Sequence, residues 1–296
     1  MDFWETGEMR WKGRQQSENV EDVRGMRPGV KMAGGGGFAV LIIIILAMFF
    51  NFEPQPLLDA VEQAGANAPQ AQASGVDDEY REFISVVLRD NEVVWEKLIK
   101  DQVRGGSAYR PPKLRIFSDQ ITTGCGRANA AMGPFYCPAD QTVYIDPTFF
   151  RELKRRHRAP GDFAQAYVIA HEVAHHVQNS LGLMKPIEKV RRSGDKQAIN
   201  QASVRLELQA DYLAGVWAHH AQKEFQILEK GDIAEAMNAA NQIGDDTLQR
   251  MSQGFVIPER FTHGTSKQRV FWFKEGLRTG DLGGCEQLFT LDYQDL

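Results

Sequence analysis

The sequence has few cysteines, no excess of basic residues and no CxxC pair. Three cysteines in 296 residues are too few for a disulfide-dense scaffold, and the missing CxxC pair argues against a structural zinc site of that kind. Because 34 Lys and Arg stand against 39 Asp and Glu, the chain lacks the positive charge that attracts nucleic acid. We therefore expect no nucleic-acid partner.

The overall composition is that of a globular protein. Hydrophobic residues make up 43% of the chain and charged residues 25%, which fits neither a fully disordered chain nor a protein with many membrane spans. A chain of 296 residues is long enough for one sizeable core with additional segments.

One hydrophobic run is exceptional, because Phe38 to Phe50 contains no polar residue. Together with the preceding small residues, the uncharged stretch 32–50 approaches the ~20 residues that cross a bilayer as a helix. A buried helix or a cleaved signal peptide would be alternatives, but the run has no polar face and lies far from the N-terminus. We predict a transmembrane anchor. Basic residues precede the run and acidic residues follow it, which predicts a cytoplasmic N-terminus and an extracytoplasmic body in a single-pass membrane protein.

The run divides the chain into four predicted parts: an N-terminal cytoplasmic segment (1–31), the anchor (32–50), a flexible linker rich in Pro, Gln, Ala and Gly (51–75), and a body (76–296). Helical spacing of apolar residues in the body predicts helices at 76–98, 161–181, 197–222, 233–252 and 266–276. Short strands are predicted at 114–117, 129–137 and 142–146, the last two as an antiparallel pair. The expected fold is α+β, mainly helical with a small antiparallel sheet.

The most specific local signal is an H-E-x-x-H motif formed by His171, Glu172 and His175 in the helix predicted at 161–181. The two histidines lie one helical turn apart on the same flank, so both imidazoles can reach one metal ion. Glu172 projects away from them, as expected of a base that acts on a water at the metal. The bare motif also arises by chance, so a third ligand is required.

Glu207 and Asp211 provide the best candidate for that ligand. They are four residues apart in the next long helical pattern and so lie on one face, where one carboxylate can bind the metal while the other accepts the free N–H of a ligand histidine. Apolar neighbours indicate that this face is buried, and buried carboxylates need partners. The alternative is a pair of solvated acids on a surface helix.

With these residues in view, the chain resembles the bacterial putative neutral zinc metallopeptidases, a membrane-anchored family of the gluzincin group. The resemblance covers almost the whole chain, at Arg10 to Arg14, Asn19 to Asp22, the anchor, Gly133 to Pro138, the H-E-x-x-H helix, Glu207 to Asp211, and Thr262 to Gly264. It implies a zincin-like fold behind the anchor, one catalytic zinc held by His171, His175 and Glu207, and Glu172 as the catalytic base. It also implies a location in the bacterial cytoplasmic (inner) membrane. Relatives often carry Cys where this chain has Tyr212, which leaves Cys285 without an expected partner.

The resemblance further suggests that the segment from Ala130 through Ala131, Met132 and Gly133 to Phe135 is the edge strand that pairs with an extended substrate. Pro134 within this segment is compatible with an edge strand and argues against a central one.

Two smaller features leave alternatives open. Cys125 and Cys137 bracket a turn-rich segment and can pair as a disulfide in an oxidising compartment, or remain as two buried thiols. His263 precedes a predicted helix, where it can reach the zinc site and stabilise an oxyanion, or simply belong to the helix cap.

The predicted activity is therefore that of a membrane-anchored zinc metalloendopeptidase, with a peptide or protein substrate and the lipid bilayer as partners. Glu172 would take a proton from the attacking water and return it to the leaving amine. A membrane-tethered zinc-binding scaffold with little turnover is the alternative. Zinc hydrolysis of a non-peptide amide would use the same residues.

Overall fold

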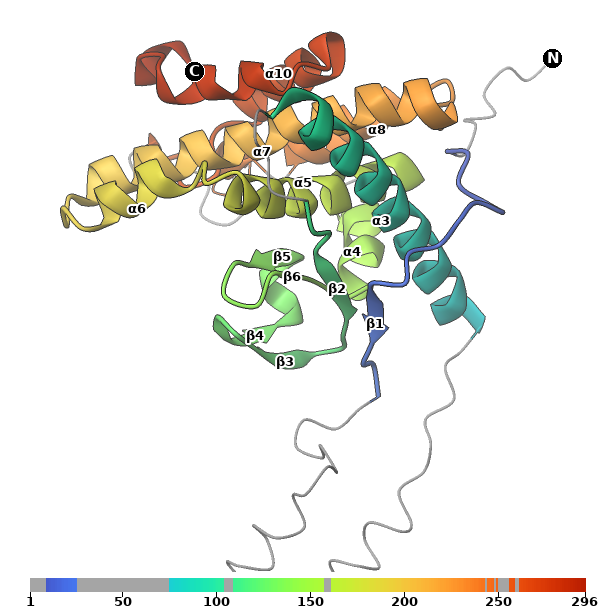
Figure 1. The fold of residues 1–296 in the computed structure, drawn as a ribbon. Helices are drawn as coiled ribbons and strands as arrows, with labels where there is room; N and C mark the ends of the chain where they lie inside the picture. The colour runs from blue at the N-terminus through green and yellow to red at the C-terminus, as the bar shows by residue number, and fades with distance from the viewer. Residues whose placement is uncertain are drawn as a thin grey trace, which may run out of the picture.

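The computed structural model describes residues 9–25, 75–103, 109–156, 161–242, 244–247, 249, 256–258 and 261–296. The predicted anchor at 32–50 lies outside these residues, as does the predicted linker at 51–75 except its last residue. Figure 1 shows a layer of helices lying above a small sheet, which confirms an α+β fold that is mostly helical.

Long helices build most of the described body, and their apolar faces form one large core. The helices are α3 (Gly75–Gln102), α4 (Thr148–Arg156), α5 (Asp162–Ser180), α6 (Lys185–Arg191), α7 (Lys196–Phe225), α8 (Asp232–Gln242) and α10 (Ser266–Thr279). Short 3-10 helices are η1 (Ala130–Met132), η3 (Gly283–Phe289) and η4 (Tyr293–Asp295). The predicted helices at 161–181, 197–222 and 266–276 correspond closely to α5, α7 and α10, whereas α8 ends well before the predicted residue 252.

The main sheet has four strands in the order β1-β2-β6-β5, and β3 and β4 form a separate hairpin. The strands are β1 (Val20–Asp22), β2 (Lys113–Ile116), β3 (Gln120–Thr123), β4 (Gly126–Asn129), β5 (Phe135–Cys137) and β6 (Thr142–Ile145). Only β5 and β6 of the main sheet are antiparallel, because a short turn joins them, whereas β2 runs parallel to both β1 and β6. The sheet is thus mixed and not antiparallel as predicted.

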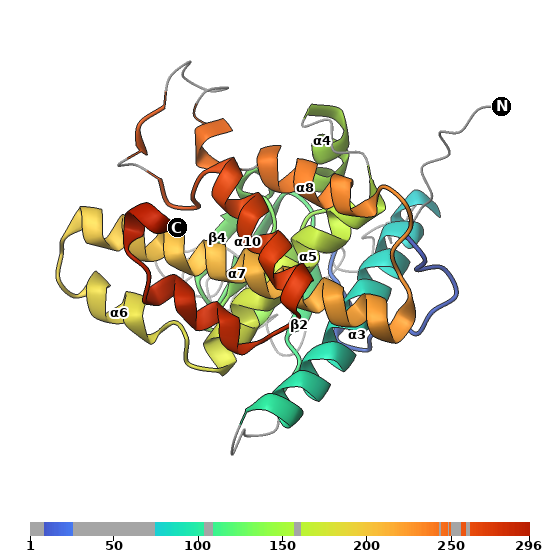
Figure 2. The ribbon, with the colours of Figure 1, turned by 90° about the horizontal axis from the view of Figure 1, so that it is seen from above.

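Helices α7 and α10 approach each other unusually closely, and Figure 2 shows α10 lying across α7. A Cβ atom on Gly215 of α7 would lie 2.1 Å from the carbonyl oxygen of Phe273, and one on Gly276 of α10 would lie 1.9 Å from that of Tyr212. No side chain fits in these positions, so the two glycines allow backbone-to-backbone packing.

The N-terminal segment 9–25 is an integral part of this body. Met9 and Trp11 are 2% and 5% exposed and belong to the main core, and β1 pairs with β2. The backbone N–H of Met9 donates to Asp162 at the start of α5 (3.1 Å), and Arg14 forms an ion pair with the buried Asp90 of α3 (2.6 Å). Residues 9–25 of the predicted segment 1–31 therefore share a core with residues from 75 onward.

This packing corrects the predicted location in the cell. A single crossing between residues 25 and 75 would put the N-terminal segment and the rest of the chain on opposite sides of a bilayer, whereas both lie in one core. Moreover, none of the helices in the described ranges is long and apolar enough to cross a membrane. The prediction of a cytoplasmic N-terminus and an extracytoplasmic body in the bacterial cytoplasmic membrane is wrong, and the bilayer is not retained as a partner.

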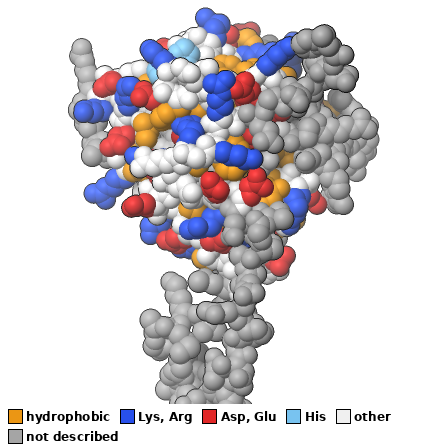
Figure 3. Space-filling model, turned by 90° about the vertical axis from the view of Figure 1, so that its right-hand side faces the viewer, with side chains coloured by type: hydrophobic (Ala, Val, Ile, Leu, Met, Phe, Trp, Pro, Cys, Tyr) orange, Lys and Arg blue, Asp and Glu red, His pale blue; other side chains and the backbone are white. Residues whose placement is uncertain are grey.

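The molecular surface gives no sign of a dominant charge on the face that Figure 3 draws. Basic and acidic side chains alternate over the described residues there, with apolar side chains between them. Ion pairs also bring opposite charges together on the described surface, such as Lys97 with Glu224 (2.7 Å) and Arg278 with Glu275 (2.7 Å).

Candidate metal centre and active site

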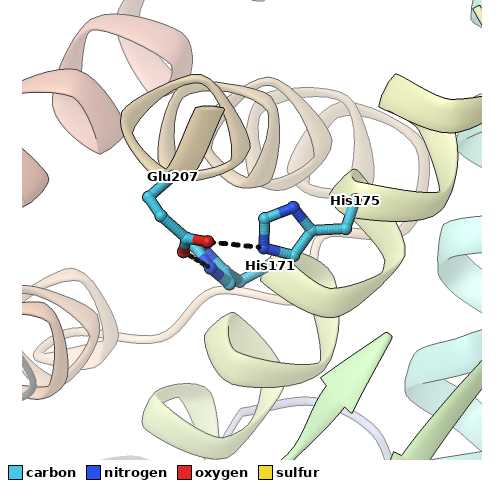
Figure 4. A group of neighbouring side chains, drawn as sticks. All are labelled: His171, His175 and Glu207. Carbon is cyan, nitrogen blue, oxygen red and sulfur yellow. Dashed lines mark hydrogen bonds and ion pairs between the residues drawn. The ribbon is translucent and has the colours of Figure 1, made fainter. Parts of the chain in front are cut away.

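Helix α5 places His171 and His175 side by side, and α7 brings Glu207 to them. Figure 4 shows the two imidazoles and the carboxylate pointing toward one another. Nε2 of His171 lies 3.1 Å from Oε2 of Glu207, and Nε2 of His175 lies 3.5 Å from Oε1. These side chains are only 7%, 12% and 18% exposed. The structure therefore brings together three donor atoms that lie within 4.8 Å of one another.

The other ring nitrogen of each histidine has its own partner. Nδ1 of His171 donates to Oδ1 of Asp211 (2.9 Å), and Nδ1 of His175 donates to Oε1 of Gln178 (2.8 Å). The amide nitrogen of Gln178 donates in turn to the carbonyl oxygen of Leu206 (2.7 Å), which fixes the orientation of the amide. Both imidazoles thus turn Nε2 toward Glu207 and the candidate metal position, which is the usual orientation of ligand histidines.

This donor set fits zinc. A tetrahedral zinc ion with ligands at ~2.1 Å holds those ligands ~3.4 Å apart. The observed separations of 3.1 and 3.5 Å between Glu207 and the two histidines are close to that value. Two imidazoles and one carboxylate also leave a fourth position for water or substrate, as catalytic zinc sites require.

Asp211 has the strongest set of partners in the centre. It is fully buried, and it accepts hydrogen bonds from the Tyr167 hydroxyl (2.5 Å) and from His171 and Arg269. Burial raises the pKa of Asp211, but Arg269 and His171 outweigh this effect and lower it to about 2. Asp211 is therefore ionised, and it can act as the acceptor that the sequence suggested. Burial lowers the pKa of His171, but Asp211 and Glu207 outweigh it and raise that pKa to about 10.

Glu172 opens onto a cleft of about 650 Å³ that also exposes His171, His175 and Glu207. Glu172 is only 8% exposed, and burial raises the pKa of its carboxyl group. A carboxylate with a raised pKa holds a transferred proton more readily than a solvated one, which suits a general base. Other lining residues come from α6 and the residue before it, from residues 130–136 and from α4, and include Met184, Ile187, Glu188, Met132, Tyr136 and Phe149.

His263 also lines this cleft, and its position is fixed by Asp245. The carboxylate of Asp245 accepts hydrogen bonds from the backbone N–H groups of Thr262 and His263 (both 2.6 Å), and its Oδ1 lies 3.2 Å from Nδ1 of the imidazole. The hydrogen bond to Asp245 raises the pKa of His263, and the side chain remains half exposed. The imidazole can therefore offer an N–H to a ligand in the cleft.

The predicted edge strand needs a correction. Ala130, Ala131 and Met132 form the 3-10 helix η1, and Gly133 follows with a φ of 76°, so this segment does not pair as a strand. The Asn129 side chain caps η1 by accepting from the N–H of Ala131, a competing local bond that strands lack. The edge strand of the main sheet that borders the cleft is instead β5. All four predicted residues still line the cleft.

Strand β5 is linked to α5, the helix that carries His171 and His175, by Tyr136. The hydroxyl of Tyr136 lies 3.1 Å from Nδ1 of His176 and accepts from the amide of Asn179 (3.0 Å), both on α5. Cys137 at the end of β5 forms a disulfide with Cys125 of the β3–β4 hairpin. The edge strand is thus held from both sides. Cys285 is a buried free thiol, whose pKa burial raises to about 12.

Several residues of the centre escaped sequence reasoning. Arg269, Tyr167, Gln178 and Asp245 all bond directly to predicted site residues. Gln178 is three residues after His175 on the same helix, so helical spacing alone could have suggested it. Arg269 and Asp245 carried no local signal, because only the packing of distant segments brings them to the site.

Comparison with known proteins identifies the family of this chain. Residues 9–288 match the family described as putative neutral zinc metallopeptidase. The uncharacterized protein YpfJ of Escherichia coli (strain K12) is 43% identical over 285 residues, which cover 94% of this chain and 98% of that protein. The uncharacterized proteins Mb2605 of Mycobacterium bovis and Rv2575 of Mycobacterium tuberculosis are each 40% identical over 219 residues, or 70% of this chain and 71% of theirs. No solved structure matches the chain.

The family match includes the N-terminal segment and the C-terminal region up to residue 288, so it covers nearly all of the body that the structure describes. The resemblance drawn from the sequence motifs is thereby confirmed. The chain belongs to the putative neutral zinc metallopeptidase family.

Proposed function

We propose that this protein is a zinc metallopeptidase with a zincin-like active site that hydrolyses peptide bonds in a peptide or protein substrate. One observation carries the proposal: the two histidines of α5 and Glu207 of α7 converge beside Glu172 in a single cleft. His171, His175 and Glu207 would hold one zinc ion. Asp211 and Gln178 would orient the two imidazoles.

Zinc at this centre would supply a Lewis acid that polarises the scissile carbonyl and makes a water molecule more acidic. Glu172 then accepts the proton of the attacking water and donates it to the leaving amine. Its burial supports both steps, because a carboxyl group with a raised pKa can hold the proton between them. A site that only stored zinc would have no use for a carboxylate in this position.

The remaining cleft residues would bind the substrate. The free edge of β5 can pair with an extended peptide through main-chain hydrogen bonds, as exposed sheet edges do. His263, held by Asp245, can donate to the oxygen that becomes negatively charged as the carbonyl is attacked. Residues 9–25 and the chain from 75 onward would together form the catalytic unit.

The decisive experiment compares wild-type protein with Glu172→Gln. The amide keeps the size of the side chain but cannot accept the proton, so we expect retained zinc and a loss of hydrolysis of at least ~10²-fold on a quenched-fluorescence peptide library. Glu96→Gln, on the exposed face of α3, is the matched control and should retain full activity. If the wild type binds zinc yet cleaves no better than Glu172→Gln, the zinc-binding scaffold is the better interpretation.

A further inference from the structure

Arg269 is a buried arginine next to the proposed metal ligands, and nothing in the sequence motifs points to it. It is 3% exposed. Its Nε donates to Oδ2 of Asp211 (2.8 Å) and its Nη2 donates to Oδ1 (3.0 Å), so the guanidinium binds both carboxylate oxygens. This two-point geometry fixes the plane of the carboxylate as well as its position.

Helix α10 positions Arg269 next to Asp211. The helix begins with a capping box, in which Thr265 and Gln268 bond to each other's backbone, and Arg269 follows in its first turn. Gly215 and Gly276 then allow α10 to lie directly against α7, the helix that carries Asp211. The arginine is therefore positioned by two rigid helices and not by a loop.

Asp211 passes this constraint to a metal ligand. Its Oδ1 accepts from Nδ1 of His171 (2.9 Å) and from the Tyr167 hydroxyl (2.5 Å). With both oxygens held by Arg269, the carboxylate cannot rotate away, so the imidazole keeps Nδ1 toward Asp211 and Nε2 toward the metal position.

We propose that Arg269 is a positioning residue of the metal centre: through Asp211 it holds His171 in the orientation in which Nε2 binds zinc. The inference rests on the proposed function only in requiring zinc at His171, His175 and Glu207, and it does not require peptidase activity. It assigns to α10 a part in metal binding that is separate from the ligands themselves.

The positive charge of Arg269, taken alone, predicts the opposite effect on zinc affinity, so the sign of the change distinguishes the two explanations. Nη2 of Arg269 lies 3.5 Å from Nδ1 of His171, so the guanidinium is close enough to repel a dication. Its removal would strengthen zinc binding if electrostatics dominated. Removal would weaken zinc binding if Arg269 acts by positioning. The variant Arg269→Lys distinguishes electrostatics from positioning further, because lysine keeps the positive charge but cannot bind both carboxylate oxygens of Asp211 in one plane.

The experiment measures zinc affinity of the full chain by competition with a chromophoric chelator for wild type, Arg269→Lys and Arg269→Met. We expect both variants to bind zinc ~10 to 100-fold more weakly, the usual effect of losing an outer partner of a ligand. Arg278→Lys and Arg278→Met are the matched controls, because Arg278 lies on the same helix, is 68% exposed and pairs with Glu275. They should keep wild-type affinity.

A double-mutant cycle tests whether the effect passes through Asp211. In an Asp211→Asn background, Arg269→Lys should have little further effect on zinc affinity. If Arg269→Met alone fails to fold, the double variant Asp211→Asn with Arg269→Met replaces it, because it removes both buried charges together. Cobalt-substituted protein adds a spectroscopic readout, since a displaced His171 would change its visible absorption. Zinc affinity of Arg269→Lys equal to the wild type, tighter binding in Arg269→Met, or additive effects in the cycle would overturn the proposal. Zinc binding by the wild type without hydrolysis would defeat only the proposed peptidase function.

Discussion

Trp11 offers a direct test of whether the N-terminal segment belongs to the folded unit. The indole is 5% exposed and packs edge-to-face against Phe83 of α3, with ring centroids 5.3 Å apart. A buried aromatic side chain of this kind removes ~150 to 250 Å² from water, and its truncation to alanine in a core costs ~3 to 5 kcal/mol. We therefore expect Trp11→Ala to lower the free energy of unfolding by about that amount.

The assay is urea unfolding of the full chain, followed by circular dichroism so that loss of the helices is observed directly. Lys12→Ala is the matched control, because Lys12 is the next residue, its side chain is 62% exposed, and its ion pair with Glu79 is long at 3.7 Å. Such a pair contributes ~0 to 1 kcal/mol. If the free energies of unfolding of Trp11→Ala and Lys12→Ala agree within error, residues 9–25 do not share the core. The packing argument against a membrane crossing between residues 25 and 75 would then fail.

Three further predictions follow from the site and its supports. Glu207→Ala should abolish stoichiometric zinc binding, measured by atomic absorption after dialysis, because two ligands bind far more weakly than three; unchanged zinc would remove Glu207 from the centre. Burial raises the pKa of Asp90 to about 7 from an ordinary value of 3.8, so the folded state binds its proton more tightly and stability should fall as pH rises between these values. Asp90→Asn should flatten that dependence in unfolding curves. Cys125→Ser should lower the midpoint of thermal unfolding, because the disulfide to Cys137 no longer restricts the unfolded chain, and an unchanged midpoint would contradict this.

The residues proposed as metal ligands could be picked out from the sequence because their placement depends on short-range geometry. In a helix, the spacing of His171, Glu172 and His175 fixes which side chains lie together, and the same rule places Glu207 beside Asp211. Burial of both helices in the core then follows from their apolar faces. What local spacing could not give is the pairing of α5 with α7, which was inferred from chemistry and which the structure shows.

The errors arose where distant segments decide the outcome. The sequence predicts an antiparallel sheet because its strand signals are neighbours along the chain, yet β1 comes from the N-terminal segment and pairs in parallel with the distant β2. Within 130–133, the strand prediction is wrong because Asn129 caps a tight 3-10 turn and Gly133 takes a positive φ of 76°. The membrane orientation is predicted only from the charges that flank the apolar run, and those charges carry no information about the burial of Trp11 in the core.

That packing also connects the N-terminal segment to α5, the helix of the proposed metal centre. The first residue of α5, Asp162, accepts the N–H of Met9 (3.1 Å), and the same helix carries both histidines proposed as ligands nine and thirteen residues further on. The helix has Gly161 at its N-cap, with no side-chain cap, so its first turn relies on the surrounding structure for support. Variants that weaken the packing of residues 9–25 should therefore increase fraying at the start of α5. Because the fraying spreads from the N-terminus of the helix, it should affect His171 before His175.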